Sequence, residues 1–145
     1  MGKAVLLSLN PKWFEPIMQG KKTKEVRKRA PLIKHPYKVY LYCTKNGEIA
    51  YRAGVKGKFK PYQMNGTICG EFTCVSTVEQ TPPFKDCMAG TYLTAREFYS
   101  FLGESDKMSF MLIKDPILYD KPKTLADFGL KYPPQSWRYV EEPDE

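Results

Sequence analysis

The side chains best suited to chemistry lie in one short segment, residues 20–34, where seven lysines and arginines surround a single carboxylate, Glu25. A nearby cation lowers the pKa of a carboxylate and keeps it ionised. Arginine forks onto phosphate oxygens with paired hydrogen bonds, whereas lysine supplies a point charge. The segment therefore predicts an anion site in which Lys22, Arg27 and Arg29 bind phosphate. Glu25 is either a catalytic group, an orienting partner or a structural ion pair.

The same segment predicts a charged strand over residues 22–29. Side chains alternate between the two faces of a strand. Glu25, Arg27 and Arg29 are therefore expected on one face, and Lys22 on the other.

Positive charge is concentrated in the first part of the chain. Residues 1–60 carry 15 basic and 3 acidic side chains, whereas residues 61–145 carry 8 basic and 13 acidic ones. Such asymmetry predicts a basic face for a polyanion such as a nucleic acid. The alternative is a lysine-rich surface that only aids solubility.

Composition excludes several classes of protein. The 145 residues fit one domain, 1–145, and the aromatic content of 14% argues against disorder. No apolar run approaches the ~20 residues of a membrane span, and none resembles a signal peptide, so we expect a cytoplasmic protein without a membrane partner. The four cysteines form no C-x-x-C pair and His35 is the only histidine, so we predict neither a metal nor a cofactor.

Short strands and a few helices must position this segment. Asn10-Pro11 is typical of a helix start, and Thr94 with Glu97 predicts a capping box. Predicted helices cover residues 11–18, 95–102 and 124–128. Predicted strands cover residues 3–9, 22–29, 37–43, 48–52, 68–78, 108–113, 117–119 and 137–140.

Asn46-Gly47 predicts a tight turn that joins 37–43 and 48–52 in a hairpin, and Gly70 predicts a bulge or barrel corner. Pro116 is expected to divide 108–119 into two strands, and Trp13 is expected in the core.

Four parts of the sequence resemble ASCH domains, the small PUA-like proteins of bacteria and phages. The first is Gly20-x-Lys22-x-x-Glu25-x-Arg27, which fits the GxKxxExR motif of that family. The other three are Leu6-Leu7-Ser8-Leu9-Asn10-Pro11, Gly70-Glu71-Phe72 and Pro133-Pro134-Gln135-Ser136-Trp137.

The resemblance implies an α+β fold, a small PUA-like β-barrel of five to six mostly antiparallel strands with two to three helices. It also implies a cleft beside the first helix, with the motif strand as its floor, that binds RNA or a nucleotide-like ligand. Aromatic side chains such as Tyr42 and Trp137 are candidates for stacking on a base, although burial in the barrel is the competing interpretation. The predicted ligand-binding residues are Ser8, Lys22, Glu25, Arg27, Arg29, Tyr42, Glu71 and Trp137.

Three alternatives remain open at this point. Some ASCH proteins resemble amidohydrolases of acylated cytidine nucleosides, but this chain has Glu25 where they carry a threonine. A ribonuclease would have to use Lys22 and Glu25 as its acid and base. The third alternative is a phage or bacterial accessory protein that docks on an unknown protein partner through its acidic second half.

Overall fold

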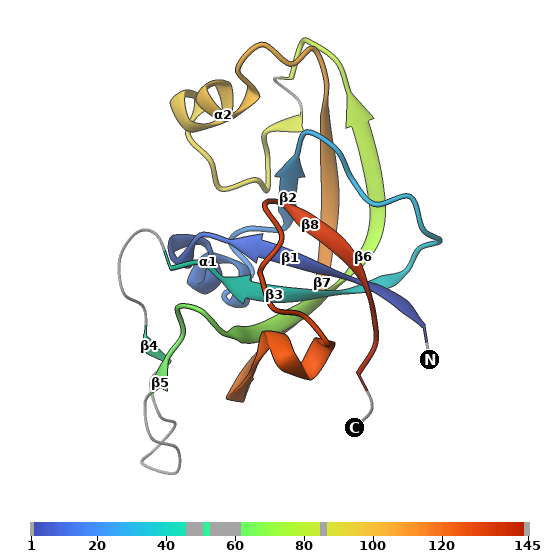
Figure 1. The fold of residues 1–145 in the computed structure, drawn as a ribbon. Coiled ribbons are helices and arrows are strands. Elements are labelled where there is room, and N and C mark those ends of the chain that lie inside the picture. Colours follow the sequence, from blue (N-terminus) through green and yellow to red (C-terminus); the bar gives the residue numbers. More distant parts are fainter. Residues whose placement is uncertain (1, 46–50, 53–61, 85–86, 144–145) are drawn as a thin grey trace.

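The computed structural model describes residues 2–45, 51–52, 62–84 and 87–143. A six-stranded sheet runs in the order β2-β7-β6-β3-β1-β8, and every neighbouring pair is antiparallel except β1 and β3 (Figure 1). The predicted α+β class and the number of strands are confirmed. The elements are β1 (Lys3–Leu9), α1 (Phe14–Met18), β2 (Lys24–Arg27), β3 (Tyr37–Cys43), β4 (Tyr51–Arg52), β5 (Tyr62–Gln63), β6 (Ile68–Gln80), α2 (Ala95–Leu102), β7 (Met108–Lys123) and β8 (Trp137–Glu141).

The first helix begins as predicted, immediately after β1. The Asn10 side chain accepts a hydrogen bond from the backbone N–H of Lys12, and Pro11 opens a 3-10 turn that ends at Trp13. The α-helix that follows has five residues, with Pro16 in its first turn, and it ends just before Gly20, whose φ is 76°. This short helical segment brings Trp13 close to the segment around Glu25.

The long strands β6 and β7 form the largest ladder of the sheet. The prediction that Pro116 divides residues 108–119 into two strands is wrong, because β7 continues through it. The register shifts beside Pro116, and Asp115 has a φ of 51°, so a bulge absorbs the missing N–H. The predicted irregularity at Gly70 is confirmed, since a Cβ there would lie 2.7 Å from the carbonyl oxygen of Ile117.

The predicted closed barrel is wrong in one respect, because the sheet is open between its two edge strands. β2 and β8 stand at opposite ends of the strand order and share no backbone ladder among the described residues. Side chains bridge the gap instead. The indole N–H of Trp137 donates to the carbonyl oxygen of Arg29 at 2.8 Å, and the Tyr139 hydroxyl accepts from the N–H of Leu32 at 2.8 Å. We call the gap between β8 and the segment from β2 to residue 33 the seam.

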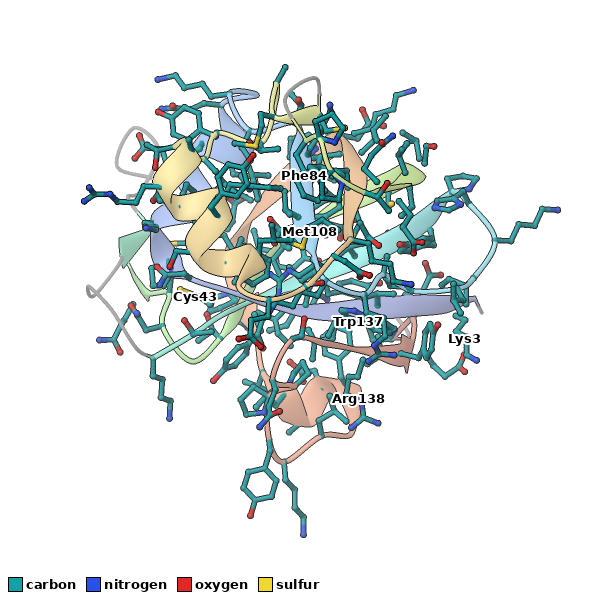
Figure 2. All side chains as sticks on the ribbon, turned by 90° about the horizontal axis from the view of Figure 1, so that it is seen from above. Lys3, Cys43, Phe84, Met108, Trp137 and Arg138 are labelled. Atoms are coloured by element: carbon teal, nitrogen blue, oxygen red, sulfur yellow. The ribbon has the colours of Figure 1, made fainter. Side chains whose placement is uncertain are left out.

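The helix α2 packs on one side of the sheet over its own apolar cluster (Figure 2). The predicted capping box is present, since Thr94 accepts from the N–H of Glu97 while the Glu97 carboxylate accepts from the N–H of Thr94. Phe98 lies within 5.1 Å of Phe84, measured between ring centroids, and its side chain is fully buried. Val26 of β2 belongs to the same cluster, so this packing holds α2 beside β2.

Two further predictions concern the edges of the fold. The predicted hairpin between residues 37–43 and 48–52 lies largely outside the described residues, and Tyr51–Arg52 pairs with Tyr62–Gln63 instead of with β3. None of the helices in the described ranges has the length and apolarity that crossing a bilayer requires.

Candidate functional site

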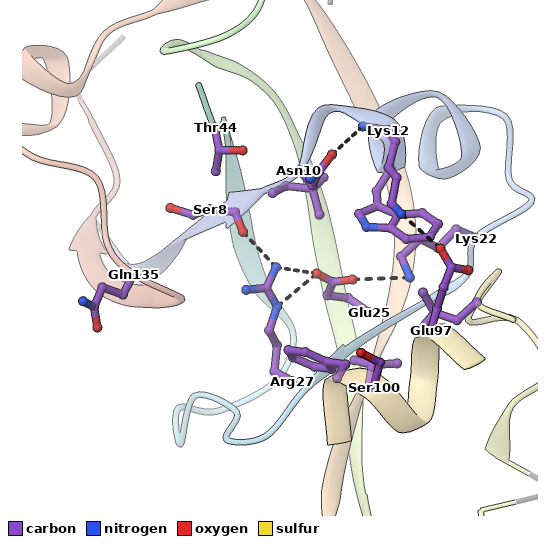
Figure 3. Close-up of a pocket in the computed structure, with 15 residues that line it drawn as sticks. Ser8, Asn10, Lys12, Lys22, Glu25, Arg27, Thr44, Glu97, Ser100 and Gln135 are labelled. Carbon is purple, nitrogen blue, oxygen red and sulfur yellow. Dashed lines mark hydrogen bonds and ion pairs between the residues drawn. The ribbon is translucent and has the colours of Figure 1, made fainter. Parts of the chain in front are cut away.

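A cleft of about 630 Å³ opens between the end of β1, the segment leading into β2, and α2 (Figure 3). Polar and charged side chains converge on it from elements that are far apart in the sequence. They are Ser8, Asn10, Lys12, Lys22, Glu25, Arg27, Thr44, Glu97, Ser100 and Gln135, together with the ring of Trp13. The cleft is therefore assembled by the fold around the motif segment.

Lys22 is a buried ammonium at the floor of this cleft, with 2% of its surface exposed. Its Nζ donates to the carbonyl oxygen of Thr91 at 2.6 Å and lies 3.4 Å from Oε1 of Glu25. It also lies 5.0 Å from the centroid of the Trp13 ring. Burial lowers the pKa of Lys22 below its ordinary value, and the nearby Glu25 carboxylate opposes that effect.

The prediction that Lys22 and Glu25 occupy opposite faces is wrong. β2 begins at Lys24, two residues after Lys22, so strand alternation does not apply to the lysine. The backbone of residues 21–24 instead bonds to the carbonyl oxygens of Pro16 and Gly90. This path turns the lysine toward the carboxylate.

Glu25 is a buried carboxylate held between two cations, with 4% of its surface exposed. Its Oε2 accepts hydrogen bonds from Nε of Arg27 at 3.0 Å and from a terminal nitrogen of the same guanidinium at 2.6 Å. Burial on its own raises the pKa of this carboxyl. The charges and hydrogen bonds of Arg27 and Lys22 outweigh burial, and the pKa lies below its ordinary value. Glu25 is therefore ionised at neutral pH.

The Arg27 guanidinium crosses the seam as well as binding Glu25. One terminal nitrogen donates to the carbonyl oxygen of Ser8 at 2.8 Å, and the other lies 3.2 Å from Oγ and 3.5 Å from the carbonyl oxygen of Ser136. With the two bonds to Glu25, acceptors within the protein match all five guanidinium N–H groups. A phosphate would have to displace one of them. The geometry thus gives Arg27 a positioning role where the sequence suggested a phosphate fork.

The structure brings four of the predicted site residues together and separates the other four. Ser8, Lys22, Glu25 and Arg27 line the cleft. Arg29 and Trp137 line a neighbouring hollow in the seam, where the guanidinium lies 4.6 Å from the centroid of the indole ring.

Tyr42 and Glu71 do not line the cleft, and their role in ligand binding stays a prediction. Tyr42 is buried in an apolar cluster with Leu6 and Ile68. Glu71 accepts a hydrogen bond from the Tyr119 hydroxyl at 2.6 Å and pairs with Lys38 at 3.4 Å. Both residues stabilise another face of the sheet.

Sequence reasoning missed the wall of the cleft that α2 provides. Glu97 and Ser100 line it, and Glu97 pairs across the opening with Lys12 at 3.0 Å. The sequence predicted Glu97 only as a helix-capping residue, and nothing in the sequence linked this helix to the motif segment. Trp13 was predicted to be a core residue, and it does pack against the main core while also lining the cleft.

The ionised state of Glu25 predicts acid sensitivity of the fold. Because its folded pKa lies below the 4.5 of an ordinary glutamate, the unfolded chain takes up the proton first. The stability that this carboxylate contributes is complete above pH 4.5 and is lost as pH falls through the folded pKa.

The free energy of unfolding, measured in urea at pH 7, 5, 4 and 3, should therefore decline more steeply for the wild type than for Glu25→Gln. Glu79→Gln, on an exposed ion pair, should follow the wild type. If the stability of the wild type and of Glu25→Gln fell equally with pH, the lowered pKa of Glu25 would be contradicted.

Comparison with known proteins identifies the fold. No family model and no curated protein sequence matches the chain. Among solved structures, the ASCH protein from Zymomonas mobilis superimposes with a TM-score of 0.71 at 20% identity, covering 96% of this chain and 88% of that one. Two mutant forms of the same protein each superimpose with a TM-score of 0.71 at 19% identity. These matches cover 96% of this chain and 91% and 89% of the two mutant chains. The chain therefore has the fold of the ASCH proteins.

Proposed function

We propose that the cleft binds one nucleoside or nucleotide unit, either free or as part of an RNA. The observation that carries this proposal is the combination of a buried ion network with an aromatic ring in one open hollow. Its volume of about 630 Å³ falls within the roughly 300–1,000 Å³ typical of small-molecule sites.

Each group at the floor has a role in this proposal. The Lys22 ammonium has three N–H donors and bonds or pairs with two acceptors in the described part of the chain, which leaves one donor for a ligand oxygen or ring nitrogen. Oε1 of Glu25 faces Lys22 alone among the described cations, and it has capacity to accept an N–H of a base. A donor and an acceptor side by side match the edge of a nucleobase.

The Trp13 ring is the stacking surface in this proposal. The Lys12 ammonium lies 4.6 Å from the ring centroid and pairs with Glu97 at 3.0 Å, and its side chain is 57% exposed, so a base could displace it at the cost of an exposed ion pair. A base in its place would gain roughly 1–3 kcal/mol from stacking. The displaced lysine would then be free to meet a phosphate of the same nucleotide.

The charge of the cleft favours a base over a run of phosphates. Its lining includes three cations, Lys12, Lys22 and Arg27, and two carboxylates, Glu25 and Glu97. Each carboxylate pairs with at least one of those cations. A nearly balanced cleft suits an uncharged, hydrogen-bonding group.

A bulky residue on the α2 wall tests the proposal. Ser100 is exposed, belongs to the cleft lining and forms no part of the ion network, so Ser100→Trp should fill the cleft and leave the fold intact. We expect calorimetric titration of the wild type with the four ribonucleosides and their 5′-monophosphates to detect binding. The variant should bind at least about 100-fold more weakly, equivalent to ~2.7 kcal/mol.

Ala95→Trp is the matched control, because Ala95 is exposed on the same helix and does not line the cleft. It should bind like the wild type. Absence of binding by the wild type at millimolar nucleoside, or equal binding by Ser100→Trp, would contradict the proposal.

Hydrolysis is the second candidate, and one observation favours it. Lys22 is a buried lysine with a lowered pKa in a cleft, which is an arrangement found at catalytic sites. Against it, the ionised Glu25 is a weak base and stands where the amidohydrolases that the sequence resembles carry a threonine. Incubation of the protein with N4-acetylcytidine and with a short RNA decides between hydrolysis and binding alone. Release of acetate, or strand cleavage, by the wild type but not by Lys22→Met would establish an enzyme, and intact substrates would leave binding alone.

A further inference from the structure

The seam carries two further hollows beyond the cleft, and adjacent hollows share lining residues. One, of about 570 Å³, is lined by Arg29 and by residues 134–139. The next, of about 690 Å³, is lined by residues 28–33 and by side chains of β6, β7 and β8. Gln135 lines both the cleft and the first hollow, and Arg29 lines both hollows. The cleft and the two hollows are therefore neighbours along the seam.

The charge of the seam differs from that of the cleft. Its two hollows are lined by four cations, Lys28, Arg29, Lys107 and Arg138, and by one carboxylate, Glu79, which lies 3.7 Å from Lys107. Within the described ranges, no carboxylate pairs with Lys28, Arg29 or Arg138. The excess positive charge evident in the sequence is thus available along the seam more than at the floor of the cleft.

Aromatic rings accompany these cations. Trp137 lies under the Arg29 guanidinium, and Tyr139 packs edge-on against Trp137 at 5.1 Å between ring centroids. Figure 2 shows Trp137 and Arg138 as neighbours on β8, at the open edge of the sheet. Trp137 is buried, with 8% of its surface exposed, and Tyr139 is partly exposed, so Tyr139 offers the accessible ring edge. Cations without a carboxylate partner beside such an edge are a combination by which proteins hold single-stranded nucleic acids without reading their sequence.

We propose that the seam is the track for the sugar–phosphate backbone of a single-stranded nucleic acid, one nucleotide of which occupies the cleft. This inference rests on the proposed function of the cleft. Arg29 and Arg138 bind phosphates along the track, and Tyr139 lies beside the sugars and bases. A single strand fits because the cleft admits one unpaired base and the hollows adjoin it.

The test measures how affinity grows with strand length. A fluorescein-labelled RNA octanucleotide of mixed sequence is displaced by unlabelled RNA of one, two, four and eight nucleotides, and a parallel series uses DNA. The proteins are the wild type, Arg29→Gln/Arg138→Gln, and Lys114→Gln/Lys121→Gln. The last variant removes the same charge from exposed positions on β7 that line none of the hollows. Thermal unfolding checks each fold, and Arg138→Gln alone replaces the double variant if the loss of the Arg29–Trp137 contact prevents folding.

In the wild type, the octanucleotide should bind at least about 100-fold more tightly than the mononucleotide, since each bond to a charged group contributes about tenfold or more. The arginine double variant should lose most of this gain while its mononucleotide affinity stays within about twofold. The slope of log affinity against log salt should fall by roughly 1.4, for two phosphates released from contact. The lysine double variant should retain both the gain and the slope. Equal gains with RNA and DNA would indicate a backbone track, and a gain with RNA alone would indicate contacts to the 2′-hydroxyl.

Two failures are distinguishable. If the mononucleotide binds but the octanucleotide binds no better, or if both double variants lose affinity equally, the seam is not the track and the cleft proposal stands. If no mononucleotide binds to any of the proteins, the proposed function of the cleft fails and this inference fails with it. Displacement of the octanucleotide by an octaglutamate peptide at equal concentration would also overturn the inference, by showing a general preference for anions.

Discussion

Replacing Glu25 with alanine should lower the free energy of unfolding by roughly 3–5 kcal/mol, the usual cost of removing one partner from a buried ion pair. The loss is large because Lys22 and Arg27 remain in place without the carboxylate that compensates them. Lys22 is almost fully buried, and Arg27 would lose the acceptor of two of its hydrogen bonds. Urea denaturation at pH 7, followed by circular dichroism, measures the difference.

The matched control is Glu79→Ala. Glu79 pairs with Lys107 at 3.7 Å, and both side chains are more than half exposed, so its loss should cost less than about 1 kcal/mol. A loss of similar size for the two variants would mean that the network around Glu25 is as well solvated as a surface pair, and the description of the floor of the cleft would then be wrong.

Replacing Arg27 with methionine should cost roughly 2–4 kcal/mol and should loosen the seam. The substitution leaves the Ser8 carbonyl oxygen without its 2.8 Å donor and reduces the partners of Glu25 to Lys22. Because no backbone ladder joins β2 to β8 in the described chain, nothing replaces these bonds. Hydrogen exchange should therefore accelerate in residues 137–141 more than in β6, whose ladder with β3 is untouched.

Arg138→Met provides the comparison for the second prediction. Arg138 is exposed on β8, and within the described ranges its side chain makes a single hydrogen bond, a 3.4 Å contact to the neighbouring Tyr139 carbonyl. Its loss should change stability by no more than about 0.5 kcal/mol and should leave exchange in β8 unaltered. Uniform acceleration across the whole sheet in Arg27→Met would argue that the arginine stabilises the fold globally and does not close the seam.

Local signals in the sequence accounted for much of the fold. The Asn10-Pro11 start and the pair Thr94 and Glu97 predicted helix starts correctly, because capping depends on neighbouring residues alone. Pro116 misled the prediction because the effect of a proline depends on the partner strand. Pro116 lies in a bulge of β7, where residues 114–117 face only residues 71–73 of β6, so the missing N–H costs no ladder bond, and no local pattern encodes that bulge.

The candidate site was predictable only as far as the motif itself extends. Glu25 and Arg27 were placed on one face because they lie two residues apart on a strand. The position of Lys22 depends on hydrogen bonds to Pro16 and Gly90, and the far wall of the cleft comes from a helix 70 or more residues away. Arg27 carried the strongest sequence signal for phosphate binding, yet its donors are committed to Ser8, Glu25 and Ser136. Contacts between residues far apart in the sequence decide which acceptors these N–H groups bond to.

The opening between β2 and β8 also has a mechanical consequence. In the described part of the chain, side chains of Arg27, Trp137 and Tyr139 bridge it, and none of these bonds belongs to a backbone ladder. Each bridge can therefore break without unzipping a pair of strands. We expect the width of the opening to vary while the ladders of the other strands keep their register.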